Sequence, residues 1–257
     1  MHPVAFHVGS VPIYWYGVLL AVAFVAGLWT ASRRCVRDGL KPESILDAGT
    51  WLILGTIIGA RALYVMTYWR EQFAEAPWTE MFMIRHGGLV FYGGLIGATL
   101  AVLVYVRLKK LPLWKLADAL APSIPLGYVF GRIGCLMFGC CYGRPTGLSW
   151  AIHFPADHAT HGAGVHPTQI YDAGLNLGLY VGLAALYRRK RFDGQVFVAY
   201  LAAYAVFRGL VEIFRGDYTT EYVLGWLTPA QLVGILVFLV AAALWWRLPR
   251  PRSKAAA

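Results

Sequence analysis

GQVFVAYLAAYAVFRGLVEI, residues 194–213, is the stretch that decides the class of fold. Its first charged residue is Arg208, and Glu212 follows close to the end. A helix needs about 20 mostly apolar residues to cross the hydrocarbon core of a bilayer. The stretch therefore predicts a membrane-spanning helix that carries an arginine and a glutamate near one end.

Six more stretches of this kind occur along the 257 residues. The chain is 58% hydrophobic and 14% charged, whereas soluble domains are about 25% charged. This composition argues against a disordered chain, a coiled coil and a soluble globular protein. We predict an all-α, polytopic integral membrane protein, with residues 1–257 forming a single membrane domain. Its seven transmembrane helices are expected at 12–31, 47–67, 88–106, 117–137, 171–187, 194–213 and 229–246, with an outer loop at 139–170.

The formal net charge of +10 is distributed unevenly along the chain. Four groups of four basic residues lie in alternate loops, at 33–41, 107–115, 188–191 and 247–254. Because cytoplasmic loops carry the excess of Lys and Arg, we expect the N-terminus outside and the C-terminus in the cytoplasm. No basic segment precedes the first span, so we interpret it as a retained helix and not as a cleaved signal peptide. The charge then explains orientation, and no nucleic-acid partner is expected.

The seven remaining basic residues are all arginines, and several lie in or beside predicted spans. An arginine inside the bilayer costs about 2.5–3.5 kcal/mol on insertion scales, so it usually pairs, faces a cavity or binds an anion. Helical spacing places Arg208, Glu212 and Arg215 on one face, with the carboxylate between two guanidinium groups. Two interpretations remain: a buried ion cluster that fixes helix packing, or a site for an anion such as a phospholipid headgroup. The seven are Arg61, Arg70, Arg85, Arg132, Arg144, Arg208 and Arg215.

Histidines gather in the predicted outer loop. His153, His158 and His161 lack the spacing and carboxylate partners of a metal site, so we interpret them as solvated. His166 differs because Pro167 follows it at the start of a predicted helix. We expect His166 to point toward the mouth of the helix bundle.

Glycines recur at four-residue spacing within the predicted spans. This spacing lets helix backbones approach closely in a membrane. Tight helix packing is therefore the expected role of most of them. The glycines are Gly55 with Gly59, Gly93 with Gly97, Gly127 with Gly131, and Gly174 with Gly178 and Gly182.

Five motifs in this order resemble one known family. They are YWYG at 14–17, HGGLVFYGG at 86–94, GRIG at 131–134 with Gly139 and Gly143-Arg144 after it, HPTQIY at 166–171 and FRGLVEIFR at 207–215. Together they resemble the prolipoprotein diacylglyceryl transferases of bacteria, over a region from Tyr14 to Gln231. The family has seven transmembrane helices and an external N-terminus, which agrees with the predicted topology.

The resemblance implies an enzyme of the bacterial cytoplasmic (inner) membrane, with its active site toward the outer leaflet and no cofactor. Its activity would be transfer of the diacylglyceryl group of phosphatidylglycerol to the lipobox cysteine thiol of a preprolipoprotein signal peptide. A thioether forms and glycerol phosphate leaves. The implied catalytic residues are Arg208, His86, Tyr92 and Glu212, and the implied substrate-binding residues are Arg132, Arg215, Tyr16, Arg61 and His166.

This sequence departs from the family pattern at the candidate base. Many members have a histidine where Tyr92 stands, and a tyrosine with a pKa near 10 is a poor base at neutral pH. Either His86 acts from its loop, or Tyr92 only positions the lipid and the base lies elsewhere or is not needed.

Three cysteines fill the signature segment, two of them at positions where the family commonly has Asn and Glu. Cys135, Cys140 and Cys141 are interpreted as small buried residues or as partners in a disulfide on an oxidising face. Their spacing is unusual for zinc and shows no fourth ligand, so no metal site is expected. A redox role for these thiols is a further alternative.

Two other classes of function compete with a transferase. A transporter for an anionic or lipid substrate would use the same intramembrane charges, but the two halves show no repeat and the charges crowd the outer side. A membrane thiol oxidoreductase would depend on Cys135, Cys140 and Cys141 and would not need Arg132.

Overall fold

The computed structural model describes residues 3–84, 87–217 and 226–248. The chain divides into two compact units, one formed by Met1–Arg34 with Ala117–Ala257 and the other by Cys35–Leu116. The single membrane domain expected over residues 1–257 stays a prediction.

The first unit begins with a β-hairpin, which the sequence analysis did not predict. Strands β1 (Val4–Val8) and β2 (Val11–Tyr14) pair antiparallel around a two-residue turn in which Gly9 has a φ of 61°. Glycine readily adopts this left-handed conformation, which suits a tight hairpin. Helix α1 (Trp15–Cys35) follows directly. The first span is present but starts at Trp15, three residues later than expected, because the residues before it belong to a strand.

The region expected as one helix at 117–137 is broken at a proline. Helix α4 covers Leu113–Leu120 and α5 covers Ser123–Phe138. Pro122 lies between them, and a proline cannot donate the backbone hydrogen bond that would continue a helix. Ser123 Oγ donates to Gly27 O at 2.7 Å, which ties the start of α5 to α1.

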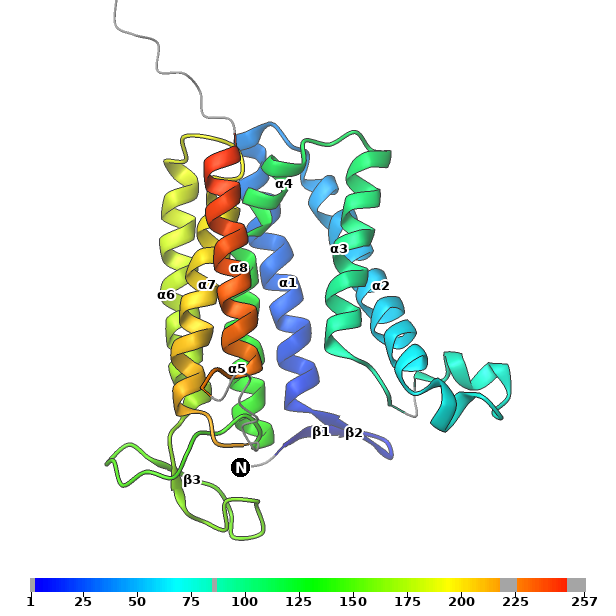
Figure 1. The fold of residues 1–257 in the computed structure, drawn as a ribbon, viewed down its shortest axis with the longest axis vertical. Coiled ribbons are helices and arrows are strands. Elements are labelled where there is room, and N and C mark those ends of the chain that lie inside the picture. Colours follow the sequence, from blue (N-terminus) through cyan, green and yellow to red (C-terminus); the bar gives the residue numbers. More distant parts are fainter. Residues whose placement is uncertain (1–2, 85–86, 218–225, 249–257) are drawn as a thin grey trace, which may run out of the picture. The chain divides into compact units, whose positions relative to one another are not determined.

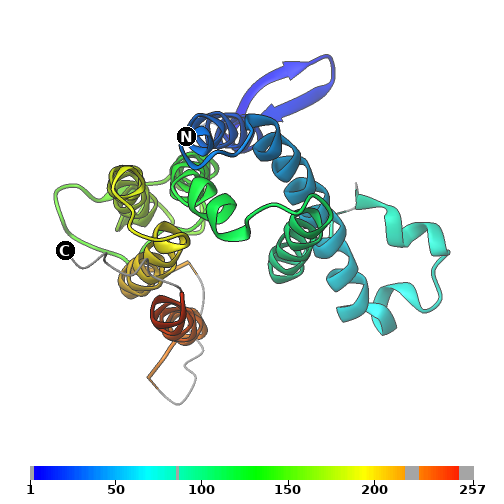
Figure 2. The same cartoon turned by 90° about the horizontal axis from the view of Figure 1, so that it is seen from above.

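Helices α6 (Thr168–Arg188), α7 (Gln195–Phe214) and α8 (Pro229–Arg247) complete the first unit. Helix α6 packs against α5 and α7, and α7 packs against α8 (Figure 1, Figure 2). Asp118 fixes the start of α7, since its carboxylate accepts from the backbone N–H groups of Gly194, Val196 and Phe197. The predicted spans 171–187, 194–213 and 229–246 agree with these helices to within three residues.

The second unit is built on two long helices, α2 (Pro42–Thr67) and α3 (Phe91–Leu108). A 3₁₀ turn (Val36–Asp38) precedes α2, and short helical segments at Trp69–Phe73 and Trp78–Phe82 lead toward α3. The helices meet at their glycines: a Cβ added to Gly55 would lie 2.5 Å from Gly97 O. The expected role in tight packing is confirmed for the glycines of α2 and α3.

The same expectation is wrong for the glycines of α6. A Cβ added to Gly174, Gly178 or Gly182 would meet no other atom within 4 Å among the described residues. Their row lies away from the packed faces of the unit, so spacing alone did not identify the side of the helix that packs.

Among the described residues, six helical segments are long and apolar enough to cross a membrane, with α4 and α5 together forming one of them. Large apolar side chains remain exposed along them, for example Ile58 on α2 and Leu239 on α8. Such extensive apolar surface fits contact with lipid. Helix α6 lies where the fifth span was expected. Its polar residues make it less apolar than the six segments, so it is not counted among them. The chain is thus a polytopic helical membrane protein.

Candidate functional site at the end of the first unit

Three segments that lie far apart in the sequence meet where α5 ends, α6 begins and α7 ends. Gly143 N donates to His166 O at 2.9 Å, and Arg144 N donates to Phe214 O at 2.8 Å. A Cβ added to Gly143 would lie 2.5 Å from the Cβ of His166. Only a glycine leaves room for this approach, and it brings together the 131–144, 166–171 and 207–215 motifs.

Arg132, in the second half of α5, is almost completely enclosed. Its Nη2 lies 2.7 Å from Asp172 Oδ2 and donates to Tyr128 OH at 2.7 Å. Its guanidinium carbon lies 4.9 Å from the centre of the Tyr128 ring. The Nε of Arg132 is buried and has no hydrogen-bond partner among the described residues. Buried polar groups are normally hydrogen-bonded, so this donor marks a position where a partner is expected.

Asp172 belongs to a buried polar face at the start of α6. Asn176 Nδ2 donates to Asp172 Oδ1 at 2.9 Å, which orients the carboxylate toward Arg132. Gln169, Asp172 and Asn176 are all buried and follow helical spacing. This role of Asp172 was not predicted from the sequence, although a polar row on a predicted span was a signal for it.

Arg208 and Glu212 form an ion pair on α7, as the four-residue spacing predicted. Arg208 Nη1 lies 2.5 Å from Glu212 Oε2. The Glu212 side chain is 1% exposed and the Arg208 side chain 17%. The carboxylate is thus fixed inside the unit, and the Arg208 side chain remains partly exposed.

Arg215 lies beyond the helix, so the helical-face argument fails for it. Helix α7 ends at Phe214, and Arg215 has extended backbone with a ψ of 145°. Its Nε and Nη2 donate to the two carboxylate oxygens of Asp217 at 3.0 and 2.9 Å. Burial lowers the pKa of Arg215, but the contact with Asp217 outweighs it and leaves that pKa raised. The bidentate partner of Arg215 is Asp217, which the sequence analysis did not consider.

His166 lies at the entrance to α6, as expected from Pro167. Its Nδ1 is 3.3 Å from Tyr171 OH, and that hydroxyl accepts from Trp150 Nε1 at 2.8 Å. The rings of Tyr171 and Phe214 flank the imidazole. Tyr16 belongs to the same unit and packs so closely on Gly134 that an added Cβ would lie 2.9 Å from the tyrosine Cδ2.

The three signature cysteines converge just past the end of α5. The sulfur atoms of Cys135, Cys140 and Cys141 all lie within 4.8 Å of one another and form no disulfide. Hydrogen bonds from Cys135 and Cys140, followed by the nearby Arg215 and Arg132, hold the pKa of the Cys141 thiol below its ordinary value. The disulfide considered from the sequence is not formed, and the three thiols instead make one cluster.

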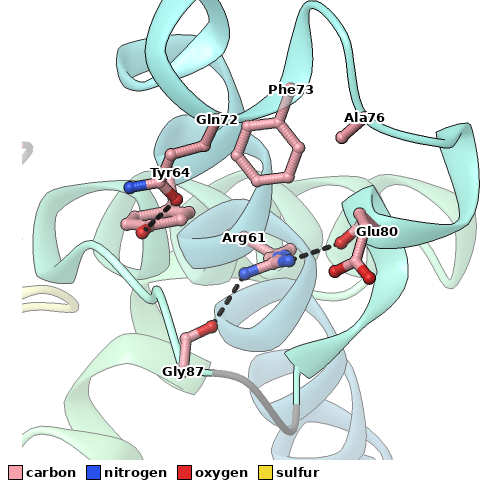
Figure 3. A pocket seen from close by; sticks show the side chains of 7 residues that line it. All are labelled: Arg61, Tyr64, Gln72, Phe73, Ala76, Glu80 and Gly87. Atoms are coloured by element: carbon pink, nitrogen blue, oxygen red, sulfur yellow. Dashed lines mark hydrogen bonds between the residues drawn. The ribbon is translucent and has the colours of Figure 1, made fainter.

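Arg61 belongs to the second unit, where it binds the backbone of the segment that precedes α3. Its guanidinium donates to Glu80 O at 2.6 Å and to Gly87 O at 2.7 Å (Figure 3). It also donates to Met81 O and Gly88 O. The surrounding cavity of about 310 Å³ is lined as well by Tyr64, Gln72, Phe73 and Ala76. These bonds give Arg61 a structural role in joining α2 to this segment.

Of the two candidate bases named from the sequence, Tyr92 lies in the first turn of α3. Tyr92 is 53% exposed, and its ring packs edge-on against Phe91. His86 lies outside the described residues. Both residues and Arg61 fall in the second unit, whereas the other predicted site residues belong to the first.

The fold and the site together define a class: a polytopic helical membrane protein with arginine–carboxylate pairs enclosed at one end of a bundle. A family model described as prolipoprotein diacylglyceryl transferase matches residues 3–247. The chain therefore belongs to this family of transferases.

Similar curated proteins cover nearly the whole chain, and each is named phosphatidylglycerol–prolipoprotein diacylglyceryl transferase. The one from Trichormus variabilis is 34% identical over 97% of this chain and 91% of its own length. The one from Nitratidesulfovibrio vulgaris is 36% identical over 98% of this chain and 95% of its own length. The one from Rhizobium meliloti is 35% identical over 99% of this chain and 94% of its own length.

Proposed function

We propose that this protein transfers the sn-1,2-diacylglyceryl group of phosphatidylglycerol to the lipobox cysteine thiol of preprolipoproteins. This is the first step of lipoprotein maturation. The sulfur attacks the glyceryl carbon that carries the phosphate ester, a C–S bond forms, and the C–O bond breaks. The electron pair of that bond leaves with glycerol phosphate.

The enclosed Arg132 is the observation that carries this proposal. A guanidinium buried in a membrane protein with an unpartnered donor suits a phosphate, since the planar fork matches phosphate oxygens. Asp172 holds the group in place through Nη2 and leaves Nε free to reach the ligand. Arg132 then binds the phosphate and stabilises the charge that develops on it as the ester bond breaks.

The second ion pair offers another guanidinium to this phosphate. Arg208 is partly accessible, and Glu212 fixes its orientation. Arg215 is held in the same way by Asp217. Arg208 thus acts as the second phosphate ligand, and Glu212 is a positioning residue. Tyr16, Arg61 and His166 are proposed to shape the lipid site, with His86 or Tyr92 as candidate bases.

The proposed topology has seven spans, with α6 as the fifth, the N-terminus outside and the C-terminus in the cytoplasm. It is supported by the alternation of basic loops along the sequence. Helix α6 buries its polar residues against the bundle, which lets a less apolar segment lie within a membrane. This orientation places Arg132 toward the outer leaflet of the bacterial cytoplasmic membrane.

The test is a transfer assay with purified protein. Phosphatidylglycerol labelled separately in the acyl chains and in the headgroup is mixed with a peptide that contains a lipobox cysteine. We expect acyl label on the peptide, with a mass increase of one diacylglyceryl group, and release of labelled glycerol phosphate. A peptide with Ser at the acceptor position should stay unmodified. A transporter would move lipid without making this product. If the purified protein makes no lipid-modified peptide, the proposal is refuted.

Replacing Arg132 tests the residue that carries the proposal. R132A should abolish transfer while the protein still inserts in the membrane. R189A is the matched control, because Arg189 is an exposed arginine at the end of α6. Near-normal turnover in R132A would overturn the assignment of the phosphate site. A thiol oxidoreductase would instead keep its activity in R132A and lose it when Cys135, Cys140 and Cys141 are replaced together.

A further inference from the structure

The backbone around the three clustered cysteines is conformationally constrained. Gly139 ends α5 with a φ of 87°, and Cys141 has a φ of 62°. A residue other than glycine is uncommon in this left-handed region, and such strain tends to be found at functional sites. The turn directs the side chains of Cys140 and Cys141 toward Cys135 on the helix.

Two buried side chains of α6 hold this turn in place. Gln169 Nε2 donates to Cys140 O at 2.7 Å, and Thr168 Oγ1 donates to Cys141 O at 2.6 Å. Both residues are at most 2% exposed. The backbone of the vicinal cysteines is therefore fixed from outside the cluster, as the groups behind metal ligands usually are.

The distances between the sulfur atoms fit one thiophilic ion. Thiolates bound to zinc at about 2.3 Å in a tetrahedron lie about 3.8 Å apart. The sulfur atoms here are within 4.8 Å of one another, so rotations of the side chains bring them to that spacing. Three thiolates and Zn²⁺ carry one net negative charge.

The proposed reaction needs a thiolate, and the carboxylates around Arg132 each form an ion pair with an arginine. Asp172 pairs with Arg132, Glu212 with Arg208, and Asp217 with Arg215. A thiol that coordinates zinc loses its proton outright. A zinc ion with three protein ligands keeps a fourth position for water or substrate, as catalytic sites do.

We propose that Cys135, Cys140 and Cys141 bind Zn²⁺ as thiolates and that its fourth position receives the acceptor cysteine thiol. This inference rests on the proposed function. On coordination the acceptor thiol releases its proton to water. Its sulfur then forms the C–S bond to the glyceryl carbon, and the C–O electron pair leaves with glycerol phosphate next to Arg132. No electron transfer is involved, so no oxidant or reductant is needed.

Metal content of the full-length purified protein is the first test. After equilibration with Zn²⁺ and removal of excess, we expect one zinc per chain in the wild type and none in the C135S/C140S/C141S variant. C35S, at the cysteine outside the cluster, should keep its zinc. C135S alone, checked for helical content by circular dichroism, covers the case in which the triple variant does not fold. Equal zinc in all variants, or a disulfide between cluster cysteines found by alkylation and mass spectrometry, would overturn the inference.

Cobalt reports whether the acceptor thiol reaches the metal. Co²⁺ bound to the three thiolates should give sulfur-to-cobalt charge-transfer absorption. The lipobox peptide should change the visible bands, and the peptide with Ser in place of Cys should leave them unchanged. Identical spectra with both peptides would refute binding of the substrate thiol at the metal.

Removal of the metal separates this inference from the proposed function. A free thiol with a pKa near 8.5 is only a few per cent thiolate at pH 7. The metal-free protein should therefore transfer the group at least about tenfold more slowly. Its remaining rate should rise with pH toward 8.5, whereas the zinc form should change little. Full transfer by verified metal-free protein overturns the zinc site and leaves the transferase. Absence of transfer in zinc-loaded protein whose cobalt form responds to the thiol overturns the transferase and supports the metal site.

Discussion

Asp172 Oδ2 lies 2.7 Å from Arg132 Nη2, in a pair whose side chains are 4% and 10% exposed. The two residues come from different helices, and Asn176 Nδ2 donates to the other carboxylate oxygen, Asp172 Oδ1. Breaking a buried ion pair by removing one charge costs about 3–5 kcal/mol, because the other charge is left without compensation. The pair therefore couples the stability of the α5–α6 contact to the position of the proposed phosphate ligand.

D172N is expected to lower both thermal stability and transfer. The substitution keeps the size of the side chain and removes its charge, so Arg132 loses its compensation and its fixed orientation. Thermal unfolding in detergent and the transfer assay measure the two effects. D193N is the matched control, since Asp193 forms a half-exposed pair with Lys190 that is worth at most about 1 kcal/mol. Equal stability of D172N and D193N would contradict this prediction.

A double-mutant cycle on α7 separates the structural and chemical roles of Arg208. R208Q and E212Q should each lower the unfolding temperature, because each removes one charge of this enclosed ion pair. R208Q/E212Q should recover part of that stability, since neither charge remains. Transfer should stay lost in the double variant if Arg208 binds the phosphate. Recovery of transfer together with stability would show that the pair only fixes helix packing.

The helices were largely predictable from the sequence, because a bilayer requires long apolar runs with charges at their ends. The Arg208–Glu212 pair was also predictable, since four-residue spacing acts within one helix. The Arg132–Asp172 pair was not, because it depends on how α5 packs against α6 across 40 positions of sequence. The Arg215–Asp217 pair was missed because it depends on the residue at which α7 ends.

Arg61 illustrates a second limit of prediction from the sequence. An arginine inside a span is costly, so Arg61 was expected to have interaction partners, and it has them. The partners are backbone carbonyls, including those of Glu80 and Gly87. Carbonyls are present at every residue and leave no pattern of side chains, so the sequence could not identify them.

R61K should loosen the segment between α2 and α3 without removing the positive charge. The four backbone carbonyls that accept from Arg61 match a planar fork, which a lysine ammonium cannot reproduce. Limited proteolysis should therefore cut residues 69–88 faster in R61K than in the wild type. The KM for phosphatidylglycerol tests the other role: a large rise with unchanged proteolysis would mark Arg61 as a lipid ligand instead.

G143A should disrupt the site although it adds a single methyl group. The new Cβ would lie 2.5 Å from the Cβ of His166, 2.7 Å from its carbonyl oxygen and 2.8 Å from Phe214 O. Two of these neighbours are backbone atoms, so the three joined segments would have to separate. Overpacking of this kind typically costs about 1–3 kcal/mol. Because Arg215 and His166 stand on the displaced segments, we expect transfer to fall together with the unfolding temperature.

G147A is the matched control in the same loop, where an added Cβ meets nothing within 4 Å among the described residues. If G143A and G147A behave alike, the close approach at Gly143 does not position the site.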